Sequence, residues 1–216
     1  MLRIFRTTII TAGLALLVTL SSCSNTQNAS ESDTQLSEPV ISGQISDAPE
    51  DDNAGTGYSQ RSVTDAASFE LLENEDGTVT ISRYIGAEGD VVIPSQIDGK
   101  TVSAIGNVTG TTGAFEGCTN MTSVVIPEGV TEIQDNAFYG CTSLETVTIP
   151  SSVTLLRNCA FCDCPNLRAI YFKGDAPQQA NYVFDSTENV TMYYQDGTSG
   201  WENPWHGRPA EVYIPE

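Results

Sequence analysis

A recurrence of apolar residues every 23 positions constrains this chain more than any other feature. Phenylalanine marks the period most clearly, at Phe115, Phe138, Phe161 and Phe184. Five further positions share the spacing: Ala114, Ala137 and Ala160; Cys118, Cys141 and Cys164; Met121, Leu144, Leu167 and Val190; Val124, Val147 and Ile170; Ile126, Ile149 and Phe172. Such self-similarity indicates tandem units that pack on one another, because a single unit cannot bury its apolar edge alone.

Each unit contains the pattern of a short β-strand. In Leu144-x-x-Val147-x-Ile149 the apolar positions alternate, as in a strand with one buried face. Pro150 then ends the strand, because proline lacks the N–H that a ladder needs. Stacked units would place equivalent residues about 4.8 Å apart and form parallel ladders. The repeat therefore predicts a β-rich solenoid of parallel stacked strands with about five coils.

The repeats resemble a known family. Residues 144–153, followed by Ala160, Phe161 and Cys164, are similar to the units of the BspA-like leucine-rich-repeat family of bacterial surface proteins. Residues 124–133, followed by Ala137, Phe138 and Cys141, match as well. The resemblance covers residues 68 to about 195. It implies a leucine-rich-repeat solenoid with a 23-residue period. It also implies an adhesin-like module that binds host or neighbouring-cell proteins, such as extracellular matrix components.

The N-terminal end of the array is predicted to be capped by a hairpin. Asp76-Gly77 separates the strand-like stretches 69–72 and 78–81, which is the strongest short-range hairpin signal. Residues 91–94 then form a first, degenerate unit. Ile126 lies 33 residues after Ile93, which is one period plus ten residues. Five of these ten extra residues fall near 96–100 and five in 107–113. Insertions in a solenoid map to surface loops, so both are candidate partner contacts.

The C-terminal end is predicted to decay into a cap. Phe184, Val190 and Tyr193 continue the phase of the preceding unit, so Tyr193 should take the place of Ile170. Residues 196–216 then form the C-terminal cap, in which Trp201 and Trp205 seal the last coil against edge pairing. A glycan-stacking platform made by these tryptophans is the alternative.

The first residues indicate export. Residues 1–22 have a cationic start with Arg3 and Arg6, an uncharged stretch over 7–20 and small residues before Cys23, which is the order of a secretory signal peptide. The stretch is too short and too rich in threonine for a membrane span. Its ending resembles the bacterial lipobox, which implies lipidation of the Cys23 thiol. We expect an exported protein, lipid-anchored to the bacterial cell envelope and surface-exposed. Ordinary secretion is the alternative.

Residues 23–67 are predicted to be a disordered acidic tether. They carry few large apolar side chains and cannot offset the entropy of ordering. The acidic run at 47–53 lacks the ligand spacing and glycine of an EF-hand loop, so no metal is expected there. The formal net charge of −19 argues against nucleic acid and against adsorption to anionic lipid, so membrane contact should occur only through the lipid anchor.

The cysteines of the array leave alternatives open. Cys118, Cys141 and Cys164 occupy a repeat position and are most simply buried thiols. Cys159 and Cys162 are extra, and with Cys164 they form a cluster that also permits a disulfide within an exported chain or a metal site. A fourth metal ligand is missing from the repeat, because the one histidine, His206, lies beyond it.

Catalysis is not expected. A Ser/His/Asp or Cys/His site needs a base that a third group orients, and His206 lies in a Gly/Pro-rich tail. We therefore expect no catalytic residue, no cofactor and a binding role.

Binding is expected on the outward face of the parallel strands. In each strand the third and fifth residues point outward, away from the buried positions. These residues are Ser123, Val125, Thr146, Thr148, Ala169 and Tyr171. Their small hydroxyls and single tyrosine suit a protein ligand or a glycan equally well. A structural envelope lipoprotein without adhesin activity is the further alternative.

Overall fold

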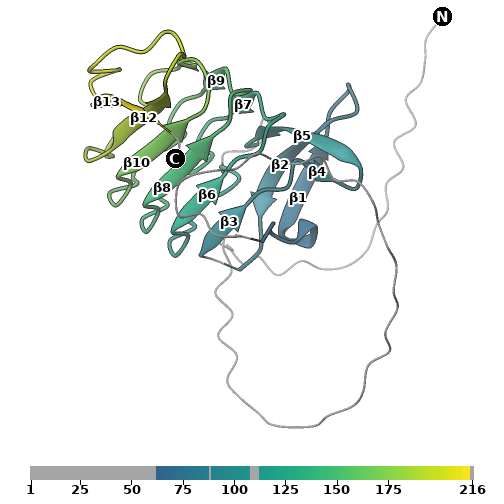
Figure 1. Ribbon diagram of the computed structural model, residues 1–216. Helices are drawn as coiled ribbons and strands as arrows, with labels where there is room; N and C mark the ends of the chain where they lie inside the picture. The colour runs from purple at the N-terminus through teal and green to yellow at the C-terminus, as the bar shows by residue number, and fades with distance from the viewer. Residues whose placement is uncertain (1–61, 88, 108–111, 215–216) are drawn as a thin grey trace, which may run out of the picture.

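The computed structural model describes residues 62–214, except residues 88 and 108–111 (Figure 1). The predicted signal peptide, Cys23 and most of the predicted tether lie outside the described residues. Within them, the regular elements are strands apart from one short 3-10 helix, η1 (Ala66–Ser68). The strands are β1 (Phe69–Glu73), β2 (Val79–Tyr84), β3 (Asp90–Val92), β4 (Gln96–Ile97), β5 (Lys100–Ile105), β6 (Ser123–Val125), β7 (Glu132–Ile133), β8 (Thr146–Ile149), β9 (Leu155–Leu156), β10 (Ala169–Phe172), β11 (Gln178–Gln179), β12 (Thr191–Gln195) and β13 (Ala210–Tyr213).

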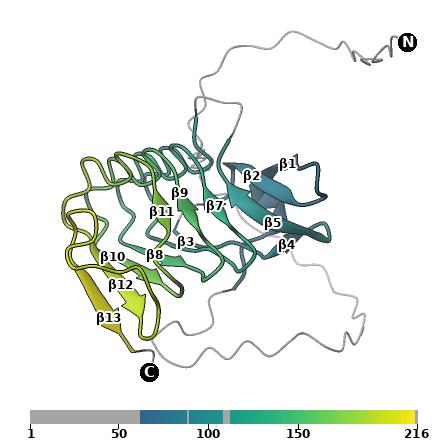
Figure 2. The ribbon, with the colours of Figure 1, turned by 90° about the horizontal axis from the view of Figure 1, so that it is seen from above.

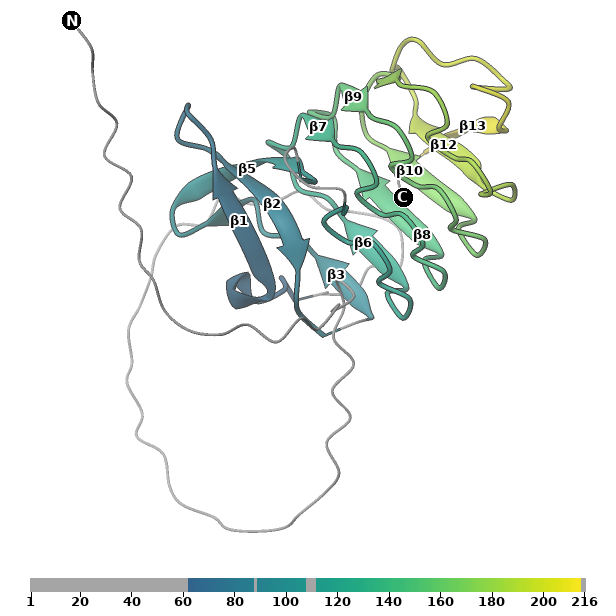
Figure 3. The ribbon, with the colours of Figure 1, turned by 180° about the vertical axis from the view of Figure 1, so that it is seen from behind.

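The strands form two sheets along the molecule. Sheet A has the order β1-β2-β5-β7-β9-β11, with β4 paired to β5, and sheet B has the order β3-β6-β8-β10-β12-β13. All pairs are parallel except β1 with β2 and β4 with β5. Figures 2 and 3 show how the chain passes from one sheet to the other in each coil. The predicted β-rich solenoid of parallel stacked strands is confirmed.

The core between the sheets consists of the periodic residues. Val124, Val147 and Ile170 follow one another in register on β6, β8 and β10, and each is at most 1% exposed. Burial of one such side chain contributes about 1.5–3 kcal/mol. The period therefore carries the packing, because each apolar position meets its own equivalent in the next coil.

A column of stacked aromatic rings runs through the coils, from one coil to the next. It consists of Tyr84, Phe115, Phe138, Phe161 and Phe184, whose successive ring centroids are 5.0, 4.9, 5.1 and 5.9 Å apart. The spacing is close to the separation of stacked strands, and the rings stack face to face with interplanar angles of 23° or less.

The carbonyl groups of the aromatic column explain the periodic cysteine. Each phenylalanine carbonyl accepts a hydrogen bond from a buried side chain of the following coil. The donors and acceptors are Cys141 Sγ to Phe115 (3.1 Å), Cys164 Sγ to Phe138 (3.2 Å) and Thr187 Oγ1 to Phe161 (2.7 Å). In these three coils the position thus holds a small side chain with a donor, which threonine supplies as well as cysteine.

The N-terminal hairpin caps sheet A, as predicted. β1 and β2 pair antiparallel through a turn at Gly77, and β2 continues parallel to β5. Gly77 has φ of 85°, a left-handed conformation that glycine adopts without steric cost. On sheet B, Thr64 exchanges hydrogen bonds with Val92 of β3. The last residues of the predicted tether, from 62 onward, thus include one that packs on the first coil.

The first insertion folds into a second hairpin. β4 and the start of β5 pair antiparallel through Asp98 and Gly99, which both have positive φ. Because residues 108–111 lie outside the described residues, the second insertion is not described as a whole.

The C-terminal coil departs from the predicted phase. Ile170 pairs with Met192, which is fully buried, and Tyr171 pairs with Tyr193. The prediction that Tyr193 takes the place of Ile170 is wrong, because this coil is one residue shorter between Val190 and its strand. A shift of one residue moves each side chain to the other face of the sheet.

The tryptophans seal the end of the core. Trp205 is 4% exposed and meets Phe172 edge-on at 5.6 Å. Trp201 stacks on Tyr194 at 5.0 Å and donates to the carbonyl of Gly174. The predicted cap is confirmed, and it adds β13 to sheet B. A platform of two exposed tryptophans is contradicted by the burial of Trp205.

Candidate functional site

The outward face of sheet B brings together all six predicted contact residues. Parallel register aligns them into two ladders, Ser123-Thr146-Ala169 and Val125-Thr148-Tyr171. Successive side chains of a strand point to opposite faces, and the intervening residues are core residues. The six therefore point away from the core. They belong to β6, β8 and β10, which are neighbours in sheet B (Figure 1).

Two of these residues offer little accessible surface. Ser123 is 4% exposed and Ala169 is 8% exposed. The Ser123 hydroxyl donates to Asp90 Oδ1 at 2.7 Å, and Ala169 lies between the larger Thr146 and Thr191 in its ladder. The prediction that Ser123 and Ala169 contact a ligand is corrected on this point, because neighbouring strands bring larger side chains close on either side.

Three tyrosines extend the accessible face. Tyr171 stacks on Tyr193 with centroids 5.3 Å apart, and Tyr213 meets Tyr171 edge-on at 5.6 Å. We call these three residues, all partly exposed, the tyrosine cluster. Sequence analysis missed Tyr193 because the 23-residue phase assigned it to the core. The alternation of polar and apolar residues at Thr191, Met192 and Tyr193 could have shown that Met192 faces the core and Tyr193 faces outward.

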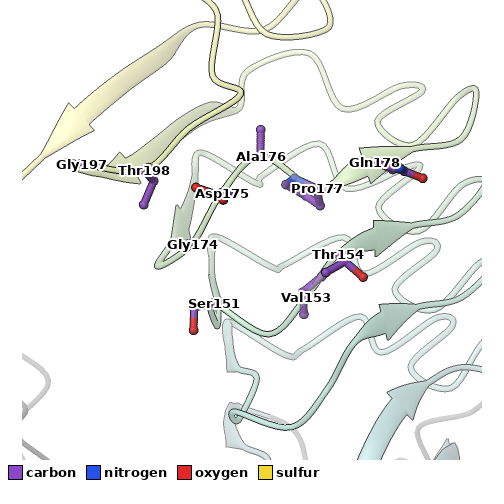
Figure 4. Close-up of a pocket in the computed structure, with 10 residues that line it drawn as sticks. All are labelled: Ser151, Val153, Thr154, Gly174, Asp175, Ala176, Pro177, Gln178, Gly197 and Thr198. Atoms are coloured by element: carbon purple, nitrogen blue, oxygen red, sulfur yellow. The ribbon is translucent and has the colours of Figure 1, made fainter.

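A groove of about 500 Å³ lies beside sheet B, at the turns that lead toward sheet A (Figure 4). Turns of three successive coils line it: Ser151, Val153, Thr154, Gly174, Asp175, Ala176, Pro177, Gln178, Gly197 and Thr198. The Asp175 carboxylate accepts the Ser199 N–H at 2.7 Å. The groove thus presents short side chains and hydrogen-bonding groups, and its one ionisable side chain is already engaged in holding a turn.

The cysteine cluster contains a disulfide. Cys159 and Cys162 are bonded, with Cα atoms 4.6 Å apart, whereas Cys164 is a buried thiol. Of the three alternatives, the disulfide applies to the first two residues and the buried thiol to Cys164. A metal site among the three is contradicted, because two of the sulfurs bond each other. Cys118 is disulfide-bonded as well, which its repeat position does not predict.

The pairing of Cys159 with Cys162 stays within one turn. Asn136, Cys159 and Tyr182 share one repeat position, and all three have positive φ, between 52° and 62°. This tight turn brings the side chain three residues later close to the first. The disulfide therefore does not link neighbouring coils.

Within the described ranges, no group of three or more His, Cys, Asp or Glu side chains is arranged to hold a metal ion. His206 lies in the cap, where its ring meets Trp205 edge-on at 5.1 Å. No helix in this part of the chain is long and apolar enough to cross a membrane.

Two surface groups have perturbed pKa values for structural reasons. A hydrogen bond to the Asp163 carboxylate raises the pKa of Tyr139, because it favours the protonated phenol. Hydrogen bonds from Thr78 lower the pKa of Asp76 in the hairpin turn. Neither residue belongs to a strand of sheet B.

Residues 109–198 match the family model described as "BspA type Leucine rich repeat region", in six copies. The matched segment contains β6 to β12 and therefore most of the sheet B face. These residues are thus similar to leucine-rich repeats of the BspA type. The predicted leucine-rich-repeat solenoid is confirmed. A comparison with curated proteins returned no match.

The chain is also similar to solved structures. The chain is similar to the leucine-rich-repeat protein TpLRR of T. pallidum, with 24% identity and a TM-score of 0.52 over 72% of this chain and 84% of that chain. A leucine-rich cell surface protein of Faecalibacterium prausnitzii has 23% identity and a TM-score of 0.46, over 73% of this chain and 52% of that chain. A leucine-rich-repeat protein of Bacteroides ovatus has 24% identity and a TM-score of 0.43, over 72% of this chain and 42% of that chain.

Proposed function

We propose that this chain is an exported, lipid-anchored protein of the bacterial envelope whose sheet B face binds a protein outside the cell, in the manner of an adhesin. The tyrosine cluster is the observation that carries the proposal. Tyrosine combines a large apolar ring with a hydroxyl and is enriched at protein interfaces. Here Tyr171 and Tyr193 continue the ladder of Val125 and Thr148 on one face, and Tyr213 meets Tyr171 edge-on.

The matched repeat type supports the same class of protein. A solenoid of this kind presents one continuous ribbon of parallel strands, which suits recognition of an extended partner surface. The ladder residues carry hydroxyl, methyl and phenol groups, and such groups bind by packing and hydrogen bonding. Extracellular matrix proteins and proteins of neighbouring cells are the proposed ligands.

The anchor is supported by the order of charged, uncharged and small residues before Cys23. Its test is metabolic palmitate labelling of the full chain in a bacterial host. We expect labelling to be lost in Cys23→Ala and retained in Asn28→Ala, a matched change downstream of the cleavage motif. Labelling that survives Cys23→Ala would show that the anchor is assigned wrongly.

The binding face is tested with a panel of extracellular matrix proteins and a glycan array. The test variant is Tyr171→Ala combined with Tyr193→Ala. The control is Tyr139→Ala, which removes a tyrosine that is 36% exposed and lies outside sheet B. Loss of interface anchors of this kind weakens binding by roughly tenfold or more. A captured protein ligand that tolerates the double change would refute the assignment of the face.

The same panel separates the alternatives. The glycan hypothesis drew on the small hydroxyls of the sheet face as well as on the tryptophans, of which Trp205 is 4% exposed. Retention on glycans alone, with sensitivity to the Tyr171 change, would replace the protein ligand by a carbohydrate. A chain that binds neither class would be a structural envelope protein.

A further inference from the structure

A second pocket lies at the C-terminal end of the solenoid, away from the sheet B face. Its volume is about 290 Å³, and it is lined by residues 179–185 of the last coil together with His206 and Arg208 of the cap. β13 extends sheet B beyond this coil, whereas β11 is the last strand of sheet A. The pocket therefore opens where the described part of the chain supplies no further strand to sheet A.

Two buried side-chain donors belong to this pocket. Arg208 Nε and Gln179 Nε2 are buried, and neither has a hydrogen-bond partner among the described residues. Folded proteins pair the great majority of such groups, since an unpaired buried donor costs about 1–3 kcal/mol. Both groups are donors, so the pocket favours a guest that accepts hydrogen bonds.

The repeat supplies a third donor. In three successive coils the N–H of the column phenylalanine donates to a carbonyl of the next coil. The pairs are Phe115 to Ala137 (2.7 Å), Phe138 to Ala160 (2.9 Å) and Phe161 to Val183 (3.0 Å). For Phe184, which lines the pocket, no backbone carbonyl of the described residues accepts this N–H.

The cap turn explains why the series ends there. His206 lies 23 residues after Val183, but it belongs to a tight turn with Gly207, closed by hydrogen bonds between Trp205 and Arg208. His206 and Gly207 both have positive φ, at 48° and 79°. The chain thus leaves the path of the coil at His206, so the His206 carbonyl does not take the place that the Val183 carbonyl has in the preceding coil.

Arg208 also has a structural role. Its Nη2 donates to the carbonyl of Phe184 at 3.1 Å, as cysteine and threonine side chains do in the earlier coils. This bond orients the guanidinium in the pocket and uses one of its five N–H donors. Asp185 lines the same pocket, so its charge disfavours guests that carry several negative charges.

We propose that this pocket binds a single carboxylate group. An arginine side chain presents a planar fork of donors that matches the two oxygens of a carboxylate. Gln179 and the N–H of Phe184 add neutral donors from the last coil. The C-terminus of a peptide, a glutamate side chain and a uronic acid all supply this chemistry.

The test measures binding of fluorescein-labelled pentapeptides to the full chain in non-ionic detergent, by fluorescence anisotropy. One peptide has a free C-terminal carboxylate, a second is the same sequence with a C-terminal amide, and a third is an amide with one internal glutamate. Unlabelled glucuronate serves as competitor. We expect the carboxylate probes to bind at least about tenfold more tightly than the plain amide. The ranking of the three carboxylates identifies the source.

Two variants locate the site. Arg208→Lys keeps a cation that can still reach the Phe184 carbonyl but removes the planar fork, and Gln179→Met removes the amide donor with little change in size. Both should weaken carboxylate binding by about tenfold. Arg168→Lys makes the same exchange at an exposed residue outside the pocket and should leave binding unchanged.

Unchanged tryptophan fluorescence and circular dichroism would establish that the variants retain the cap. The proposal is overturned if the amide peptide binds as tightly as the carboxylates, if the pocket variants bind like the native chain, or if no probe binds. In the last case the buried donors are satisfied by water alone. None of these results depends on the sheet B face.

Discussion

Replacement of Phe138 by alanine tests whether the aromatic column stabilises the solenoid as a stack. Phe138 is fully buried between Phe115 and Phe161, with ring centroids 4.9 and 5.1 Å away. Phe184 is the matched control, because it is 6% exposed and has one column neighbour, at 5.9 Å. Phe138→Ala therefore breaks contacts with two coils, whereas Phe184→Ala breaks contacts with one.

The expected magnitudes follow from this difference. Truncation of a buried phenylalanine to alanine costs about 3–5 kcal/mol, and each aromatic pair adds about 0.5–1.5 kcal/mol beyond burial. We expect Phe138→Ala to lower the free energy of unfolding by about 4–6 kcal/mol and Phe184→Ala, with one aromatic pair fewer, by about 3–4 kcal/mol. Phe138→Leu, which keeps most of the volume, should cost about 1–2 kcal/mol.

Urea denaturation of the full chain measures these losses. Circular dichroism follows the sheets, and tryptophan fluorescence follows the cap that contains Trp201 and Trp205. In a stacked array each coil stabilises its neighbours, so both signals should shift together for Phe138→Ala. A loss for Phe138→Ala no larger than that for Phe184→Ala would refute the reasoning, because a central ring would then contribute no more than a terminal one.

Three further predictions concern single groups. Thr187→Val removes a buried hydroxyl with little change in shape; this hydroxyl donates to the Phe161 carbonyl at 2.7 Å and accepts the Cys164 N–H at 3.0 Å. We expect the free energy of unfolding, measured by urea denaturation, to fall by about 2–3 kcal/mol. A Thr187→Ser control that costs as much would contradict the role of the hydroxyl. Alkylation of the unfolded, unreduced chain followed by peptide mass spectrometry should modify Cys164, but modify Cys159 and Cys162 only after reduction; modification of the pair without reductant would exclude the disulfide. Because the hydrogen bond to Asp163 raises the pKa of Tyr139, its stabilising effect is complete below the ordinary tyrosine pKa of about 10 and is lost as pH rises through the raised value. Asp163→Asn should lower that pKa in an ultraviolet titration, read as the difference from the same chain with Tyr139→Phe, and an unchanged pKa would contradict the contact.

Much of the candidate face was predictable from local pattern. The alternation in each strand assigned Val125, Thr148 and Tyr171 to the outer side, and the register confirms that they lie in one ladder. Their accessibility was not predictable in the same way. The burial of Ser123 depends on Asp90, which lies 33 residues earlier in the chain and reaches it only through the pairing of β3 with β6.

The end of the array shows where periodic reasoning fails. The cap itself was predictable, since two tryptophans after a decaying repeat are suited to covering an exposed core. The register of β12 was not, because the loss of one residue after Val190 interrupts the period without any change in composition. That single shift places Met192 in the core and Tyr193 on the outer face.

The sequence by itself determined the solenoid, its period and its caps. In a stacked array the residues that touch across coils are the residues that recur along the chain, so the core can be read from spacing alone. Only the tertiary structure decided the tyrosine cluster, the pairing of Cys159 with Cys162 and the pocket at Arg208. These features arise where the repeat is broken, and there the neighbours of a side chain depend on how the chain turns and no longer on the period.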